Sequence, residues 1–227
     1  MIRTVDETGS TNDDLAALAR AGAAEGLWLR ADRQTGGRGR QGRAWSSPPG
    51  NLYASTLVRL RPGDPPAPTL ALVAAVALHE AASHYAPGIL IKWPNDLLAG
   101  GAKLSGILLE RADDSVVIGF GVNLAHHPTD IERTATSIAA LAGAAPEPSA
   151  FLETLADALA RWLGRWRSDG VAALRRAWLA AAHPPGTALT AAGEQGLFDG
   201  LDETGALRLR LADGTVRVVH AGDVFLI

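Results

Sequence analysis

Residues 36 to 43 read Gly-Gly-Arg-Gly-Arg-Gln-Gly-Arg, a run too rich in glycine to hold a helix or a strand. Glycine lets backbone N–H groups approach a ligand closely. Arg38, Arg40 and Arg43 add planar guanidinium groups that match carboxylate and phosphate oxygens. The run therefore predicts an anion-binding loop. A solvated basic turn or a nucleic-acid contact is the alternative that this run alone leaves open.

The positive charge of the chain is local. Its net charge is -3, whereas residues 30 to 43 hold five arginines and one acid, Asp32. This distribution favours a small anionic ligand over nucleic acid. Only two of the 21 basic residues are lysines, Lys92 and Lys103, which indicates a specific use for a compact ammonium group at both positions.

Composition predicts an intracellular protein with one main core and one small satellite domain. A chain of 227 residues is long enough for both. The absence of cysteine excludes disulfides, zinc–thiolate sites and a thiol nucleophile. No apolar run reaches the roughly 18 to 20 residues of a membrane span, and the first residues lack the pattern of a signal peptide. We therefore expect a cytoplasmic location and no membrane partner.

Hydrophobic periodicity predicts an α+β fold. The helical pattern covers about 12–21, 69–85, 149–167 and 171–182, and the strand pattern covers 27–31, 52–60, 89–93, 105–111 and 116–120. Thr11 and Asp14 indicate a capping box for the first helix. Asn95 and Asp96, which follow Pro94, are expected in a turn. About 20 residues without periodicity join the first two strands, which is typical of a functional loop.

The end of the chain has a different pattern. His183-Pro184-Pro185-Gly186 interrupts the helices, and short alternating runs such as 207–211 and 216–219 follow. We therefore predict a main domain over residues 1–183 and a small β-barrel-like domain over residues 186–227.

Several short motifs occur in a fixed order along the first 125 residues or so. They are Ser10-Thr11-Asn12, the arginine run with Trp45, Lys92-Trp93-Pro94-Asn95-Asp96, Lys103-Leu104-Ser105-Gly106-Ile107-Leu108 and Gly119-Phe120-Gly121-Val122-Asn123. In this order the set resembles the biotin protein ligases. The resemblance implies a mixed, largely antiparallel sheet flanked by helices, similar to the class II aminoacyl-tRNA synthetases and biotin synthetases, with a C-terminal SH3-like barrel.

The resemblance also implies an activity. Members of the family activate biotin with ATP to form biotinyl-5'-AMP and pass the biotinyl group to a lysine of a biotin carboxyl carrier domain. ATP, Mg²⁺ and biotin are then the ligands, with no tightly bound organic cofactor. A lipoate or octanoate protein ligase, which uses the same adenylate chemistry, and a non-catalytic nucleic-acid-binding module are the alternatives.

Roles carried over from the family fall on the motif residues. Lys103 and Arg40 correspond to the catalytic residues, and Asp96 to a metal ligand acting directly or through phosphate or water. The biotin-binding positions are Ser10, Thr11, Asn12, Gln34, Gly37, Arg38 and Gly106. The nucleotide-binding positions are Arg40, Arg43, Trp45, Asn95, Asp96 and Asn123, with Trp45 stacked on adenine. For Ser10 and Thr11, helix capping is an additional reading.

Two further expectations concern partners and motion. Only nine residues precede Ser10, which leaves no room for the winged helix of the DNA-binding members, so we expect no specific DNA partner. The oligomeric state stays open, with a homodimer as one option. The arginine loop should be loosely held without ligand, because its three guanidinium groups repel one another and it has little apolar surface.

Overall fold

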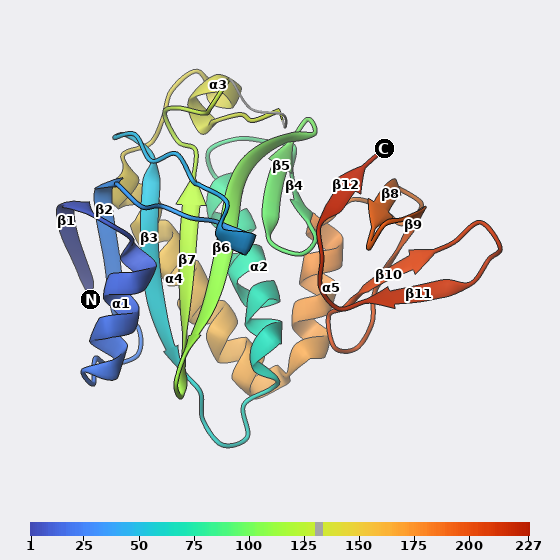
Figure 1. Cartoon of the computed structure of the whole chain (residues 1–227), viewed down its shortest axis with the longest axis horizontal. Helices are drawn as coiled ribbons and strands as arrows, with labels where there is room; N and C mark the ends of the chain where they lie inside the picture. The colour runs from blue at the N-terminus through green and yellow to red at the C-terminus, as the bar shows by residue number, and fades with distance from the viewer. Residues whose placement is uncertain (130–133) are drawn as a thin grey trace.

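The computed structural model describes residues 1–129 and 134–227 and places most of them around a seven-stranded sheet (Figure 1). In spatial order its strands are β1 (Ile2–Thr8), β2 (Trp28–Gln34), β3 (Leu52–Arg59), β7 (Ser115–Val122), β6 (Ala102–Ala112), β5 (Asp96–Ala99) and β4 (Ile89–Lys92). β1 pairs with β2 in parallel, and the other neighbours pair antiparallel. The mixed, largely antiparallel sheet is confirmed.

Three long helices cover one face of this sheet, α2 (Leu70–Ser83), α4 (Pro148–Asp169) and α5 (Val171–Ala181) (Figure 1). α2 is apolar on nearly all sides, and it packs against the sheet, α4 and α5, so most of its surface is buried. Phe151, Leu155 and Trp166 of α4 are fully buried there. The spacing of these apolar residues along α4 is thus a core pattern.

α1 (Thr11–Arg20) lies on the opposite face, where Leu15 packs with Leu29, Leu57 and Val117. It covers only part of this face, and the arginine loop covers the next part. The helix begins at Thr11, one residue earlier than predicted. Its N-cap is Ser10, whose hydroxyl accepts a hydrogen bond from the Asp13 N–H. The capping box of Thr11 and Asp14 is therefore wrong.

Three α-helices or strands of the main domain were not predicted. β1 is a mostly exposed edge strand without apolar alternation, and α3 (Ile138–Ala142) is a short helix capped by Ser137. β5 consists of four residues that pair with both β4 and β6. Asp96 is its first residue, so the prediction of a turn holds for Asn95 and is wrong for Asp96.

The C-terminal residues form a five-stranded antiparallel sheet, as expected for an SH3-like domain. Its spatial order is β11 (Val216–Val219), β10 (Leu207–Arg210), β9 (Glu194–Leu201), β8 (Ala188–Ala191) and β12 (Val224–Leu226). The Trp178 ring of α5 lies 6.4 Å from that of Phe198, so the small sheet packs directly on the helical layer. The boundary at residues 183 to 186 stays a prediction. Among the described residues, no helix combines the length and apolarity needed to span a membrane.

Glu25, in the connection between α1 and β2, forms ion pairs with arginines from other parts of the main domain. Its carboxylate accepts two hydrogen bonds from Arg167 of α4, both at 2.8 Å, and one from Arg61 at 2.6 Å. The Arg167 hydrogen bonds lower the pKa of Glu25 below its ordinary 4.5, against the opposing effect of burial. A lowered pKa stabilises the fold above pH 4.5, and this contribution is lost as the pH falls through the folded-state value.

We expect Glu25→Gln to lower the free energy of unfolding by about 2 kcal/mol at pH 7, because a charge-assisted network is lost. The melting temperature should fall by roughly 4 to 8 °C. The difference from the unmodified protein should shrink as the pH is lowered below 4.5. Thermal unfolding at several pH values measures this, with the exposed Glu153→Gln of α4 as the control. An equal difference at pH 7 and pH 3 would contradict the assignment.

Candidate active site

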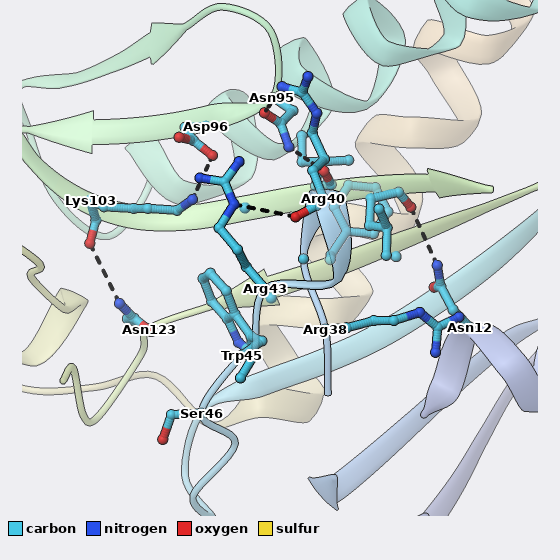
Figure 2. Close-up of a pocket in the computed structure, with 18 of the residues that line it drawn as sticks. Asn12, Arg38, Arg40, Arg43, Trp45, Ser46, Asn95, Asp96, Lys103 and Asn123 are labelled. Carbon is cyan, nitrogen blue, oxygen red and sulfur yellow. Dashed lines mark hydrogen bonds and ion pairs between the residues drawn. The ribbon is translucent and has the colours of Figure 1, made fainter. Parts of the chain in front are cut away.

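A cavity of about 590 Å³ opens on the sheet face that α1 leaves uncovered. Its walls include the arginine loop, the turn from β4 to β5, and the facing ends of β6 and β7 (Figure 2). The segment before β12 completes them. Among its described lining residues, five are basic and only two are acidic. The basic side chains are Arg38, Arg40, Arg43, Lys92 and Lys103, and the acidic ones are Asp96 and Asp223. The cavity thus favours an anionic ligand.

The arginine loop has regular structure where the sequence predicts none. Arg38 and Ala44 form an antiparallel β-bridge, and Arg40–Gly42 form a short 3-10 turn in which Gln41 has a φ of +59°. Gly37 is needed for this hairpin. A Cβ there would lie 2.7 Å from the Ser47 hydroxyl oxygen and 2.8 Å from the Trp45 carbonyl oxygen, both closer than real Cβ contacts allow.

Arg38 does not present a free fork to the cavity. Its Nη1 and Nη2 donate to the Asp13 carboxylate at 2.5 and 2.6 Å, and Nη2 also donates to Glu110 at 3.0 and 3.2 Å. The hydrogen bond from Arg38 lowers the pKa of Asp13, and the same contacts raise the pKa of the guanidinium. Arg38 therefore fastens the first arm of the loop to α1 and β6.

The other two arginines also have protein partners. Arg40 donates from Nη1 to the Asn95 side-chain oxygen at 3.3 Å, and Arg43 pairs with the carboxylate of Asp223 at 2.8 Å. Each of the three guanidinium groups of the loop, including that of Arg38, thus has an acceptor within the protein. The expected repulsion within an unpaired cluster is thus wrong as a reason for mobility. The mobility itself stays a prediction.

Lys103 and Lys92 share one carboxylate. Lys103 Nζ lies 2.7 Å from Asp96 Oδ1 (Figure 2). Lys92 Nζ lies 3.3 Å from Oδ2 of the same residue. Asp96 is buried at the start of β5, whereas the Lys103 side chain is 27% exposed. The sequence signal that singled out the two lysines therefore marks one ionic cluster. Asp96 places the Lys103 ammonium at the cavity and partly balances its charge.

The Trp45 ring packs against two glycines. Gly106 of β6 and Gly121 of β7 are paired across the strands. A Cβ at Gly121 would lie 2.6 Å from the Trp45 ring, and one at Gly106 would lie 3.3 Å from it. The Lys103 ammonium is 5.5 Å from the ring centroid, within cation–π range. The indole N–H is buried without a hydrogen-bond acceptor among the described residues.

A chain of hydrogen bonds runs from the start of α1 to the loop. Gln34 accepts from the Thr11 N–H at 2.9 Å and donates to the Ser47 hydroxyl at 3.4 Å. The Thr11 hydroxyl also contacts the Ser55 hydroxyl at 2.7 Å, and Ser55 donates to the side-chain amide oxygen of Asn12 at 2.6 Å. Four predicted site residues, Ser10, Thr11, Asn12 and Gln34, line this edge of the cavity.

The remaining amides brace backbone segments. Asn95 donates to the Ile107 carbonyl at 2.6 Å, and Asn123 donates to the Thr136 carbonyl at 3.0 Å. Asn51, which sequence reasoning missed, accepts three backbone N–H bonds of 2.9 Å from residues 124 to 126. Also missed were Asp13, Glu110 and Asp223, the carboxylates that hold the arginines. They lie outside the motifs, so only the folded chain identifies them.

Comparisons with known proteins agree with this geometry. Residues 8–123 match the biotin/lipoate A/B protein ligase family, and residues 192–227 match the biotin protein ligase C-terminal domain. The chain is 40% identical to a biotin--[acetyl-CoA-carboxylase] ligase of Paracoccus denitrificans, over 96% of this chain and 97% of that protein. It is 36% identical to the Mycobacterium tuberculosis protein of the same name, over 97% and 86%.

A solved structure of biotin protein ligase from Aquifex aeolicus, in complex with biotin and ATP, is similar over the whole chain. The TM-score is 0.90 at 25% identity, covering 100% of this chain and 99% of that one. The two domain matches follow the order of the two sheets in the fold. The chain therefore belongs to the biotin/lipoate A/B protein ligase family, as a biotin protein ligase.

Proposed function

We propose that this protein activates biotin with ATP to form biotinyl-5'-AMP and pyrophosphate, and then transfers the biotinyl group to a lysine of a biotin carboxyl carrier domain. The observation that carries the proposal is the cavity itself. It brings the Lys103 ammonium, the arginine loop and the Trp45 indole together over two facing glycines. The names of the relatives support the same reaction. The carboxylase named there is the acceptor class that we infer.

The chemistry accounts for these groups. One oxygen of the biotin carboxylate attacks the α-phosphorus of ATP, and the bond to pyrophosphate breaks. Two anions must approach each other, and negative charge grows on the α-phosphate oxygens in the transition state. Lys103 and Arg40 are the groups that we assign to this charge, as preorganised donors. In the second step the acceptor amine attacks the anhydride carbonyl and AMP leaves.

We assign the two ends of the cavity to the two substrates. The polar edge near α1 suits the ureido ring of biotin, which has N–H donors and a carbonyl acceptor. The proposed biotin residues are Ser10, Thr11, Asn12, Gln34, Gly37, Arg38 and Gly106. The proposed nucleotide residues are Arg40, Arg43, Trp45, Asn95, Asp96 and Asn123. Arg38 and Arg43 contribute by holding the loop, because their guanidinium groups are bound to carboxylates.

Mg²⁺ fits this site as an ion carried by the nucleotide. Among the described residues, no three His, Cys, Asp or Glu side chains gather to form a protein cage. Asp96 gives one oxygen to each of two lysines, which leaves it suited to contact through water. Mg²⁺ keeps several waters and is commonly held by phosphates and one or two carboxylates. When bound it would neutralise phosphate charge, while Lys103 and Arg40 orient the reacting groups.

Mass spectrometry after incubation with biotin, ATP and Mg²⁺ tests the proposal. We expect biotinyl-5'-AMP and, with a carrier domain added, one biotinylated lysine. Parallel incubations with octanoate and lipoate separate the related ligases. Adenylate formed from octanoate or lipoate, and none from biotin, would overturn the substrate assignment. The cytoplasmic location, a homodimer and the lack of a specific DNA partner stay predictions.

A further inference from the structure

The turn before β12 brings the C-terminal sheet to the cavity. Asp223 and Val224 line the cavity wall. Three side chains of the main domain donate hydrogen bonds to this segment. Lys92 Nζ donates to the Val224 carbonyl at 2.9 Å, Arg40 Nη2 donates to the Gly222 carbonyl at 3.1 Å, and Arg43 Nη2 donates to both carboxylate oxygens of Asp223 at 2.8 and 2.9 Å. Two arginines of one loop are thus attached to a single distant turn.

Arg43 is engaged by the protein on several sides. Its Nε donates to the Arg40 carbonyl at 3.3 Å, and its Nη2 contacts the Gln41 side-chain oxygen at 3.2 Å as well as Asp223 (Figure 2 shows the bond to Arg40). The guanidinium therefore connects the Asp223 carboxylate to the backbone of Arg40. Asn95, on the other side, accepts from Arg40 Nη1 at 3.3 Å. The Arg40 guanidinium is held between these supports.

We propose that Asp223 and Arg43 are a positioning pair, which orients Arg40 toward the nucleotide and does not itself bind the phosphates. The proposal rests on the proposed ligase function and names residues outside its reacting groups. The Arg43 and Asp223 side chains are 44% and 24% exposed, and ion pairs of this kind contribute little to stability. Their value lies in geometry, because a small displacement of a charged group costs much in rate or affinity.

A double-mutant cycle distinguishes positioning from direct contact. We expect Arg43→Ala and Asp223→Ala each to raise the KM for ATP by about 5- to 10-fold, and the double variant to match either single one, since both remove the same support. The KM for biotin and the melting temperature should change little. Asp223→Glu, which keeps the carboxylate, should restore most of the ATP affinity. The matched control is Asp199→Asn in β9, whose carboxylate binds Arg208 and Arg210 of its own sheet.

Two kinetic results would overturn the proposal. A much larger effect of Arg43→Ala than of Asp223→Ala would show direct binding of the nucleotide by Arg43. Additive effects in the double variant would show that the pair is not coupled.

Hydrogen exchange of residues 36–48 gives a readout without ligand or turnover. Exchange should be faster in Arg43→Ala and Asp223→Ala than in the unmodified protein, and unchanged in Asp199→Asn. Equal exchange in all four proteins would overturn the pairing. Failure of the unmodified protein to form biotinyl-5'-AMP would instead count against the proposed function, and the exchange result would still decide whether the pair holds the loop.

Discussion

Replacing Lys103 with alanine should lower the rate of biotinyl-5'-AMP formation by roughly 10²- to 10³-fold, the loss typical of removing one preorganised donor to developing charge. The ammonium lies at the cavity, 2.7 Å from Asp96 and 5.5 Å from the Trp45 ring centroid. Its position is set by the protein before any ligand binds, so little reorganisation is needed during the reaction. The folded state should tolerate the change, because Asp96 keeps Lys92 as a partner at 3.3 Å.

Single-turnover kinetics with biotin and ATP measure this effect on the chemical step directly. A wild-type melting temperature in Lys103→Ala shows that the loss is not due to unfolding. Lys92→Ala is the informative comparison, because it removes the other ammonium from the same carboxylate. Lys92 also donates to the Val224 carbonyl, so its loss should affect the attachment of the C-terminal sheet as well. Near-normal single-turnover rates in Lys103→Ala would transfer the catalytic role to Lys92.

The main elements could be predicted from sequence because the burial of an element determines which of its residues are apolar. The helix now seen at Leu70–Ser83 and the strand at Leu52–Arg59 are mostly buried, so most of their residues are apolar. β1 gives no such signal. It lies at the sheet edge with mostly exposed side chains and is held by backbone pairing to β2. β5 is too short for periodicity and begins with a charged residue that belongs to the site.

The site also has a part that the sequence predicted and a part that it did not. The motifs predicted which residues line the cavity, because cations, amides and glycines of a binding site occur in recognisable order. They did not predict the partners of those residues. Arg38 pairs with Glu110, 72 positions away, and Arg43 pairs with Asp223, 180 positions away. Such contacts depend on how β6 and the C-terminal turn are placed in space, and no local pattern encodes that.

The second large effect is expected from substitution of the glycines that contact the Trp45 ring, Gly121 and Gly106. Gly121→Ala should lower kcat/KM for adenylate formation by about 10- to 100-fold, because overpacking of about 1 to 3 kcal/mol would fall on the cavity floor. The added Cβ would lie 2.6 to 2.9 Å from three atoms of the indole, so the ring must move from its present position. Gly121 is paired on both sides, with Tyr53 and Gly106, and the strand cannot easily move instead.

Gly106→Ala, at the other glycine that contacts the indole, is compared with Gly121→Ala. Its Cβ would approach the indole only to 3.3 Å and the Lys103 side chain to 3.5 Å, so we expect a smaller loss. Gly164→Ala in α4, where a Cβ meets no atom within 4 Å, controls for the substitution itself. Calorimetric titration with biotin and with ATP would show which substrate depends on the seated indole. If Gly121→Ala retained full activity with Trp45 displaced, the ring would have no role at this position. A loss in all three glycine variants would instead point to a general effect on the fold, because only the first two are close to the indole.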